Sequence, residues 1–342
     1  MILRTAAFLY GSVTRLRNWL FDSGIFPSYQ APFPVISVGN LTAGGNGKTP
    51  LTILIVQELR SRGFSPFILS RGYGGSLAGP HLVSLTDTPR LVGDEPLLML
   101  KKCEVPVVIA RSRVAGAQFA AKHALGNVAV LDDAFQHRWL KRDLDILSIH
   151  VGTTEAAQSF AAGELLPKGR FRESRERGIT RAGAVVLATR KPTNESKEPA
   201  PLSEVLKLIS NRVPVFRSSL SIEGLFSMRG DGPVSFPRAV AFCAIANPQS
   251  FFETLTEVGV VLERTFAFRD HQLIGEKELA EMRSVVPGLP LICTEKDAMR
   301  LSEMGSSREG QDIFVLKTSL ELKPREEFVN LLLSHCGSSP RR

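Results

Sequence analysis

Short apolar runs alternate with stretches of helical periodicity over the first two-thirds of this chain. The runs occupy residues 35–38, 66–69, 105–110, 128–131, 146–150 and 184–188. Alternation of this kind is typical of a parallel sheet that helices cover on both faces. The pattern therefore predicts one doubly wound α/β domain over residues 27–212.

A second, shorter series follows an extended segment at 213–236, which we interpret as a linker. The series predicts strands at 239–246, 260–268 and 289–294, with helices at 248–258 and 275–286. The spacing of its apolar residues again alternates between that of a strand and that of a helix. We therefore expect a smaller α/β domain over residues 237–336.

Residues 1–26 have the pattern of an amphipathic helix. One face carries Ile2, Ala6, Leu9, Val13, Leu16 and Leu20, and the other carries Arg4, Gly11, Arg15, Asn18 and Asp22. Arginines interrupt the segment, so it lacks the ~20 apolar residues that cross a bilayer. Two interpretations stay open: the helix lies in the interface of an anionic membrane, or it docks on the protein's own core.

Composition narrows the classes of partner. The 342 residues are 43% hydrophobic and 22% charged, which suits a folded enzyme with two domains, and the net charge of +8 favours an anionic partner. Aromatic residues are few and are not interleaved with basic ones, which disfavours nucleic acid. The four cysteines, Cys103, Cys243, Cys293 and Cys336, lie far apart, so we expect reduced thiols in a cytoplasmic compartment.

The first strand leads into a glycine-rich turn that ends in Gly47-Lys48-Thr49. Glycines let backbone amides point at phosphate oxygens, while the lysine adds a positive charge and the threonine hydroxyl can bind Mg²⁺. A helical pattern at 50–63 follows, so strand, loop and helix come in the order of a phosphate-binding (P-loop) site. The predicted loop comprises Thr42, Ala43, Gly44, Gly45, Asn46, Gly47, Lys48 and Thr49.

The loop departs from the strict pattern at Thr42, where glycine is usual. Ala43 stands where dimeric switch ATPases have a signature lysine, which disfavours that class. The alternative to a nucleotide site is a glycine-rich turn that binds nothing.

Two adjacent carboxylates, Asp132 and Asp133, follow the apolar strand at 128–131. A carboxylate at a strand end near a phosphate-binding loop can hold Mg²⁺ directly or through water. We expect one of the two to face the metal and the other to face a neighbouring side chain. A simple turn would also explain the pair.

Asp94 and His271 are the candidates for proton transfer. Asp94 and Glu95 open a predicted helix, where carboxylates can also serve only as helix caps. His271 follows Asp270 at the end of a predicted strand, and a histidine there can titrate near neutral pH. A lone histidine is nevertheless more often structural.

Arginines and lysines gather in three places that could bind an anionic substrate. They are Arg71, the pair Arg111 and Arg113, and the cluster Lys168, Arg170, Arg172, Arg175 and Arg177. Arginine matches phosphate oxygens with two parallel hydrogen bonds. The alternative is a solvated basic loop.

Together these segments resemble the tetraacyldisaccharide 4'-kinase family, lipid kinases that phosphorylate the 4'-hydroxyl of the lipid A precursor. The matching segments run in family order and include the departure at Thr42. They are residues 38–50, 70–75, 93–96, 131–138, 166–170, 270–271 and 294–297.

The resemblance implies ATP and Mg²⁺, a lipid disaccharide monophosphate as acceptor, and a place on the cytoplasmic face of the inner membrane. It favours membrane contact for the first helix, and it implies neither a nucleic-acid ligand nor an obligatory protein partner. Carried over by motif, Lys48 and Thr49 bind phosphates and Mg²⁺, and Asp132 or Asp133 helps to hold the metal. Asp94 acts as the base with His271 as its partner. The residues expected to contact the acceptor are Arg71, Tyr73, His137, Arg172 and Glu173.

Two other functions compete with a lipid kinase. A GTPase or metallochaperone switch would need a guanine-reading Asn-Lys-x-Asp motif, and the nearest segment, Thr294 to Asp297, has no asparagine before its lysine. A soluble small-molecule kinase would use the first helix only as a structural element.

Overall fold

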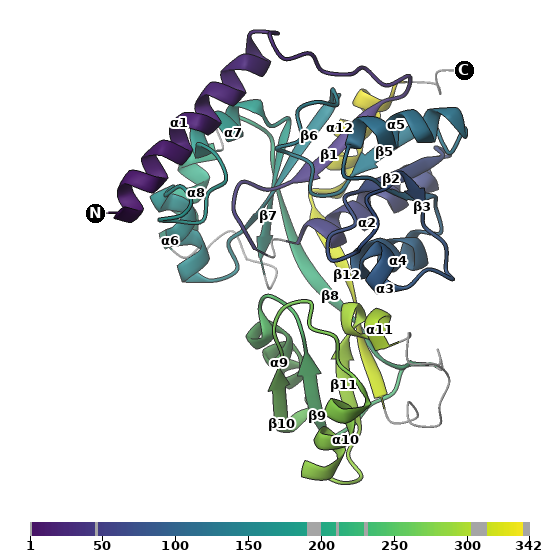
Figure 1. The fold of residues 1–342 in the computed structure, drawn as a ribbon. Coiled ribbons are helices and arrows are strands. Elements are labelled where there is room, and N and C mark those ends of the chain that lie inside the picture. Colours follow the sequence, from purple (N-terminus) through teal and green to yellow (C-terminus); the bar gives the residue numbers. More distant parts are fainter. Residues whose placement is uncertain are drawn as a thin grey trace.

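The computed structural model describes residues 2–44, 47–189, 200–209, 212–228, 232–301 and 313–337 (Figure 1). Within these ranges, twelve strands form one sheet in the order β10-β9-β11-β12-β8-β7-β6-β1-β5-β2-β4-β3. The first seven are β1 (Val35–Gly39), β2 (Pro66–Ser70), β3 (His81–Leu82), β4 (Val107–Ile109), β5 (Val128–Leu131), β6 (Leu144–His150) and β7 (Ala184–Thr189). The others are β8 (Val215–Ser227), β9 (Arg238–Cys243), β10 (Val261–Ala267), β11 (Leu291–Thr294) and β12 (Ile313–Lys323).

The α/β class predicted from the alternating pattern is confirmed, but the sheet is mixed rather than parallel. β1 pairs in parallel with β5 and β6, as expected for a doubly wound sheet. β3 and β4 pair antiparallel, and so do β8 and β12. The long strand β12 had no counterpart in the predicted elements.

Helices flank the sheet (Figure 1). Those before β8 are α1 (Ile2–Asp22), α2 (Lys48–Ser61), α3 (Pro89–Val92), α4 (Asp94–Cys103), α5 (Arg113–Lys122), α6 (Thr154–Ala162), α7 (Arg175–Arg181) and α8 (Ala200–Ile209). Those after it are α9 (Pro248–Glu257), α10 (Glu276–Val285), α11 (Glu295–Leu301) and α12 (Arg325–Cys336).

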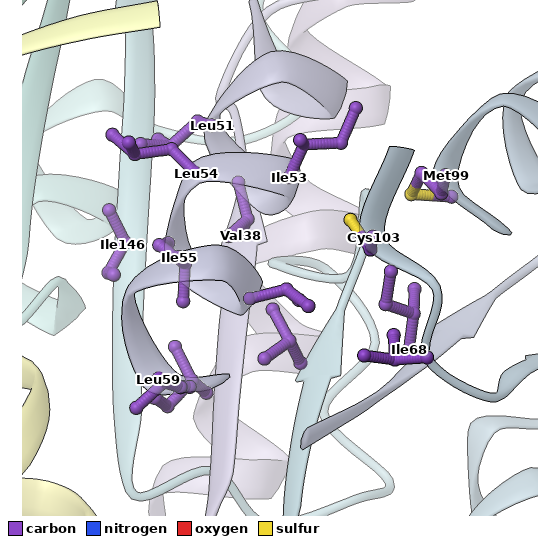
Figure 2. Close-up of a cluster of buried hydrophobic side chains, with 14 of the residues drawn as sticks. Val38, Leu51, Ile53, Leu54, Ile55, Leu59, Ile68, Met99, Cys103 and Ile146 are labelled. Atoms are coloured by element: carbon purple, nitrogen blue, oxygen red, sulfur yellow. The ribbon is translucent and has the colours of Figure 1, made fainter. Parts of the chain in front are cut away.

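The helix after the phosphate-binding loop is anchored by its apolar face. Figure 2 shows side chains of α2 beside strand residues of the same buried cluster: Leu51, Leu54, Ile55, Leu59, Val38 and Ile146. Leu51, Ile55 and Leu59 have no exposed area, so water is excluded along this face. Burial of these side chains holds the start of α2 rigidly at the carboxyl end of β1.

The predicted linker at 213–236 consists largely of a strand inside the sheet. β8 pairs with β7 from Val215 to Ser219 and with β12 from Arg217 to Ser227. The first residues of β12, Ile313 to Leu316, pair in parallel with β11. One continuous ladder therefore joins the two parts of the chain that the sequence pattern separates.

The C-terminal helix α12 packs against the larger part of the sheet, although the sequence pattern groups its residues with the smaller domain. Phe328 is buried, and its ring lies 5.0 Å from that of Phe216. Leu332 and Cys336 join the same cluster as α2. The chain thus crosses to the smaller part and returns.

Helix α1 uses the face opposite to the predicted apolar stripe to dock on the protein. Its buried residues are Ala7, Gly11, Asn18 and Phe21, and the Phe21 ring packs edge-on against Trp139 at 4.9 Å. The stripe points away from the protein, with Ile2 85% and Val13 67% exposed. Among the helices of the described chain, none has the length and hydropathy needed to cross a bilayer.

All four cysteines lie within the described ranges, and they are buried and form no disulfide. This is the state expected of reduced thiols.

Phe328→Ala should lower the free energy of unfolding by about 3–5 kcal/mol, because it opens a cavity between α12 and the sheet. Asn330→Ala, an exposed position on the same helix, is the matched control and should change it little. Denaturant unfolding of both variants measures the difference. Equal stability of the two would show that α12 is not part of the core.

Candidate active site

A cavity of about 1870 Å³ opens between the carboxyl ends of the strands around β1 and the smaller part of the molecule. In α/β sheets ligands bind at this end, outside the strand termini. Lys48, Thr49, Asp132, Asp133 and His271 all line it. The structure therefore brings the predicted phosphate, metal and proton-transfer candidates to one place.

The phosphate-binding loop connects β1 to α2, and Gly45 and Asn46 of the predicted set lie outside the described residues. Gly47 has a φ of 70°, a left-handed conformation that glycine adopts without strain. Thr42 pairs with Phe171, and the Ala43 amide donates to the Arg170 carbonyl at 2.8 Å, so the loop is tied to the following basic segment.

The N-terminus of α2 is suited to an anion. Among the described residues, no side chain caps this end and no acidic residue lies in the first turn. Gly44, Gly47, Lys48 and Thr49 line the cavity here. Free amides and the helix dipole together favour a phosphate group.

Asp132 and Asp133 have different surroundings, as expected for two neighbours on an extended chain. Asp133 lies 3.5 Å from the Lys48 ammonium and 3.1 Å from the Arg172 guanidinium. Burial would raise the pKa of Asp133, but these two cations outweigh it and lower the pKa. Asp132 accepts a hydrogen bond of 3.1 Å from Thr52, and burial, followed by the charges of Glu95 and Asp133, raises its pKa to about 7.

This excess of negative charge around Asp132 fits a divalent cation. Among the described residues, no three acidic, histidine or cysteine side chains converge into a complete metal site. Thr49 and Asp132 can nevertheless each supply an oxygen at the cavity wall, and phosphate oxygens commonly complete such a site.

Asp94 and His271 meet although they come from opposite parts of the sheet. Asp94 begins α4, and its Oδ1 lies 3.3 Å from Nδ1 of His271, which follows β10. A side chain at Gly93 would meet the Tyr73 carbonyl at 2.5 Å, so only glycine permits this close turn before Asp94. The structure thus forms the pair that the two separate motifs suggested.

The pKa values of Asp94 and His271 shift in opposite directions. Burial would raise the pKa of Asp94, but the hydrogen bond from His271 and the charge of Arg300 hold it far below its usual range. The hydrogen bond to Asp94 raises the pKa of His271. His271 lines the cavity whereas Asp94 is only 3% exposed, so a bound hydroxyl group meets the imidazole first.

The four predicted acceptor contacts Arg71, Tyr73, His137 and Arg172 line the cavity. The Tyr73 ring lies edge-on to His271 at 5.2 Å. Burial, followed by the charges of Arg113 and other arginines, lowers the pKa of His137 to about 4, so this imidazole is neutral at pH 7.

The fifth predicted contact, Glu173, lies behind the cavity wall. Its buried carboxylate accepts hydrogen bonds from Asn18 at 2.9 Å, Gln136 at 3.0 Å and Arg181 at 2.9 Å. This network joins α1 to the segment that carries Arg172. Glu173 is not available to contact an acceptor because three side-chain donors already occupy its carboxylate. It instead helps to position the neighbouring Arg172.

Part of the basic surface expected from the sequence is buried or paired within the protein. Arg113 is buried and donates to the carbonyls of Ala110 and Asp132. Arg175 donates to the Phe160 carbonyl and Lys168 pairs with Glu164. These side chains stabilise turns, so Arg71 and Arg172 remain the better candidates for contacting an anion.

Helix α11 supplies residues that the sequence did not identify as part of the site. Lys296 pairs with Glu95, and Arg300 pairs with Asp94. Asp297 accepts hydrogen bonds from the Ala244 amide and Thr294, so it is not available to read a guanine base. The match of residues 294–297 to a family motif was the only signal in the sequence, and it did not reveal these contacts.

A family model described as tetraacyldisaccharide-1-P 4'-kinase matches residues 1–337. The chain belongs to this family. A tetraacyldisaccharide 4'-kinase of Chlorobium luteolum is 40% identical over 319 residues, covering 88% of this chain and 86% of the relative. One of Haemophilus influenzae is 35% identical over 300 residues, covering 87% and 83%.

A solved structure supports the same assignment. The crystal structure of LpxK from Aquifex aeolicus in complex with ATP superposes with a TM-score of 0.75 at 28% identity, covering 97% of this chain and 98% of that one. The family phosphorylates the lipid A precursor, so this chain is a kinase of lipid A biosynthesis, and the switch-protein alternative is not favoured.

His137→Gln should reduce the acid sensitivity of the fold. The pKa of His137 is lowered in the folded state to about 4, so between pH 4 and about 6.5 the unfolded state binds more protons. The contribution of His137 to the free energy of unfolding is therefore fully present above about pH 6.5 and falls by about 1–3 kcal/mol as the pH drops to 4. Calorimetric melting across this range should show a smaller loss in the variant.

His123→Gln, at an exposed position after α5, is the control and should keep the pH dependence of the parent. Equal acid losses in the parent and His137→Gln would contradict the buried neutral imidazole.

Proposed function

We propose that this kinase transfers the γ-phosphoryl group of ATP, with Mg²⁺, to the 4'-hydroxyl of a tetraacyl-disaccharide 1-phosphate, giving the 4'-phosphate known as lipid IVA. The observation that carries the proposal is that Lys48, Asp132, Asp133 and His271 line one cavity, with the buried Asp94 in contact with His271. Direct phosphoryl transfer requires the donor site and the proton acceptor to face the same cavity.

The loop before α2 is the proposed donor site. Its amides and the Lys48 ammonium bind and orient the phosphates, and the Aquifex relative with ATP supports this assignment. Thr49 with Asp132 or Asp133 would hold Mg²⁺, which neutralises phosphate charge when bound. Lys48 now contacts Asp133, so it is already held at the cavity wall beside the carboxylates.

The acceptor is proposed to lie between Arg172, Tyr73 and His271. Arg71 and Arg172 bind the phosphate that the lipid disaccharide already carries, since guanidinium groups match its oxygens. The Asp94–His271 pair accepts the proton of the attacking hydroxyl group, with Asp94 as the buried carboxylate and His271 at the surface. Because the two residues come from different parts of the sheet, the site also excludes water when those parts enclose the substrates.

Asp94→Asn and His271→Ala should each lower kcat by about 10²–10⁴-fold, the range expected for loss of general-base help. The double variant should be little slower than either single variant, because the two groups act on one proton. Steady-state phosphorylation of the lipid acceptor measures all three. Losses that multiply would show that the residues act independently.

The exposed stripe of α1 is the proposed membrane contact. Leu9, Val13 and Leu16 point away from the protein while Arg4 and Arg15 flank them. Apolar side chains enter the acyl region and arginines pair with anionic headgroups in such helices. Polar residues of the same helix, Tyr10, Thr14 and Arg17, line the cavity. The helix would therefore place the cavity against the cytoplasmic face of the inner membrane, where a lipid acceptor can enter.

Replacing Leu9, Val13 and Leu16 together by serine should lower binding to phosphatidylglycerol vesicles by about tenfold or more, because the apolar area that enters the bilayer is lost. High salt should weaken the binding of the parent protein. Flotation of protein with vesicles measures both effects.

Leu85→Ser with Val261→Ser, which changes apolar side chains of similar exposure elsewhere, is the matched control. Equal flotation of the triple variant and this control would remove α1 as the membrane contact.

A further inference from the structure

The carboxylate of Asp94 is held from two sides, and only one of them is His271. Its Oδ2 accepts a hydrogen bond from the Arg300 guanidinium, while its Oδ1 faces His271 Nδ1 at 3.3 Å. Arg300 is 4% exposed, and within the described residues neither it nor Asp94 borders the cavity. Arg300 therefore cannot meet a substrate directly and can act only through its neighbours.

The guanidinium is itself fixed in place from behind. Nη1 donates to Asp297 Oδ1 at 3.0 Å and to the Ala244 carbonyl at 2.9 Å. Asp297 has no exposed area and accepts a further bond of 3.1 Å from the Ala244 amide. A series of bonds thus runs from the core beside β9 through Asp297 and Arg300 to Asp94.

We propose that Arg300 is a positioning residue that holds the Asp94 carboxylate in the orientation in which it binds His271. The inference rests on the proposed pairing of Asp94 with His271 in proton transfer. A planar guanidinium with two prongs suits this task, because one prong binds Asp94 and the other binds Asp297 and the backbone.

Arg300 also sets the charge around the pair. The charged groups that act on Asp94 are His271, Arg300, Lys296 and Asp297, and those that act on His271 are Asp94, Asp270 and Arg300. Nη2 of Arg300 lies 3.2 Å from His271 Nδ1. Its positive charge disfavours protonation of both partners, so its removal raises the pKa of both. The pair should then lose its own proton, and so become able to act as a base, only at a higher pH.

The fold should survive loss of this contact, because α11 and α4 are joined twice more. Lys296 pairs with Glu95, and Lys102 lies 2.8 Å from Glu295. A role in positioning can therefore be separated from a role in stability.

The experiment compares the pH–rate profiles of Arg300→Met, Arg300→Lys and the parent kinase with ATP and the lipid acceptor. In Arg300→Met we expect kcat to fall by about 10²-fold, the cost of a misplaced reacting group, with KM for ATP unchanged. The acidic limb of kcat/KM should move to higher pH by about 1–3 units. In Arg300→Lys the acidic limb should return most of the way to its parental pH, because the ammonium keeps the positive charge. Its kcat should stay low, because the ammonium lacks the two-pronged geometry of the guanidinium.

Arg142→Met is the control for buried ion pairs. Arg142 and Asp145 form an ion pair of 2.9 Å that is also largely buried. This variant should lose stability without moving the acidic limb. An unmoved limb in Arg300→Met, with a similar loss of stability, would overturn the proposal. If Arg300→Met does not fold, parental kcat in Arg300→Lys overturns it instead.

The proposed function and this inference fail in different ways. Full turnover in His271→Ala would overturn the proton-transfer pair itself. An inactive His271→Ala together with a parental profile in Arg300→Met would overturn only the role of Arg300.

Discussion

The antiparallel pairing of β8 with β12 is the constraint on which the rest of this structure depends. Its register runs from Phe314 opposite Ser227 to Lys323 opposite Arg217. The ladder is the only place in the described sheet order where the larger and smaller groups of strands adjoin. Because backbone hydrogen bonds fix it along two long strands, it sets how α4 faces α11 and how close Asp94 comes to His271.

Electrostatics then gives the three carboxylates Asp94, Asp132 and Asp133 different affinities for a proton. His271, Arg300 and Lys296 lower the pKa of Asp94, and Lys48 and Arg172 lower the pKa of Asp133. Burial, followed by the negative charges of Glu95 and Asp133, raises the pKa of Asp132 to about 7. Adjacent residues of one motif therefore differ because of the side chains that other segments bring to them. Ion pairs across the two parts of the molecule are as much a component of the site as the phosphate-binding loop.

Helix α1 connects the surface of the molecule to the same cavity. Asn18 binds Glu173, and the Tyr10 hydroxyl donates to the Arg172 carbonyl at 2.8 Å. The proposed acceptor contact Arg172 thus depends on a helix whose opposite face is apolar and exposed. Docking and membrane contact, which looked like alternatives, are compatible because they use different faces.

Sequence by itself determined the α/β class, the phosphate-binding loop with its strand and helix, and the separate motifs around Asp94, Asp132 and His271. These features depend on local periods and on residues close in the chain, such as the Gly47-Lys48-Thr49 turn before α2. The resemblance of ordered motifs added the family. The tertiary structure alone decided that β12 lies inside the sheet and that α12 packs on the same core as α2. It also decided that Glu173 is internal and that Arg300 donates a hydrogen bond to Asp94. Each of these depends on contacts between residues far apart in the chain. Neither hydrophobic period nor charge pattern specifies such partners, because the same side chains could satisfy many others until the strand pairing brings two of them together.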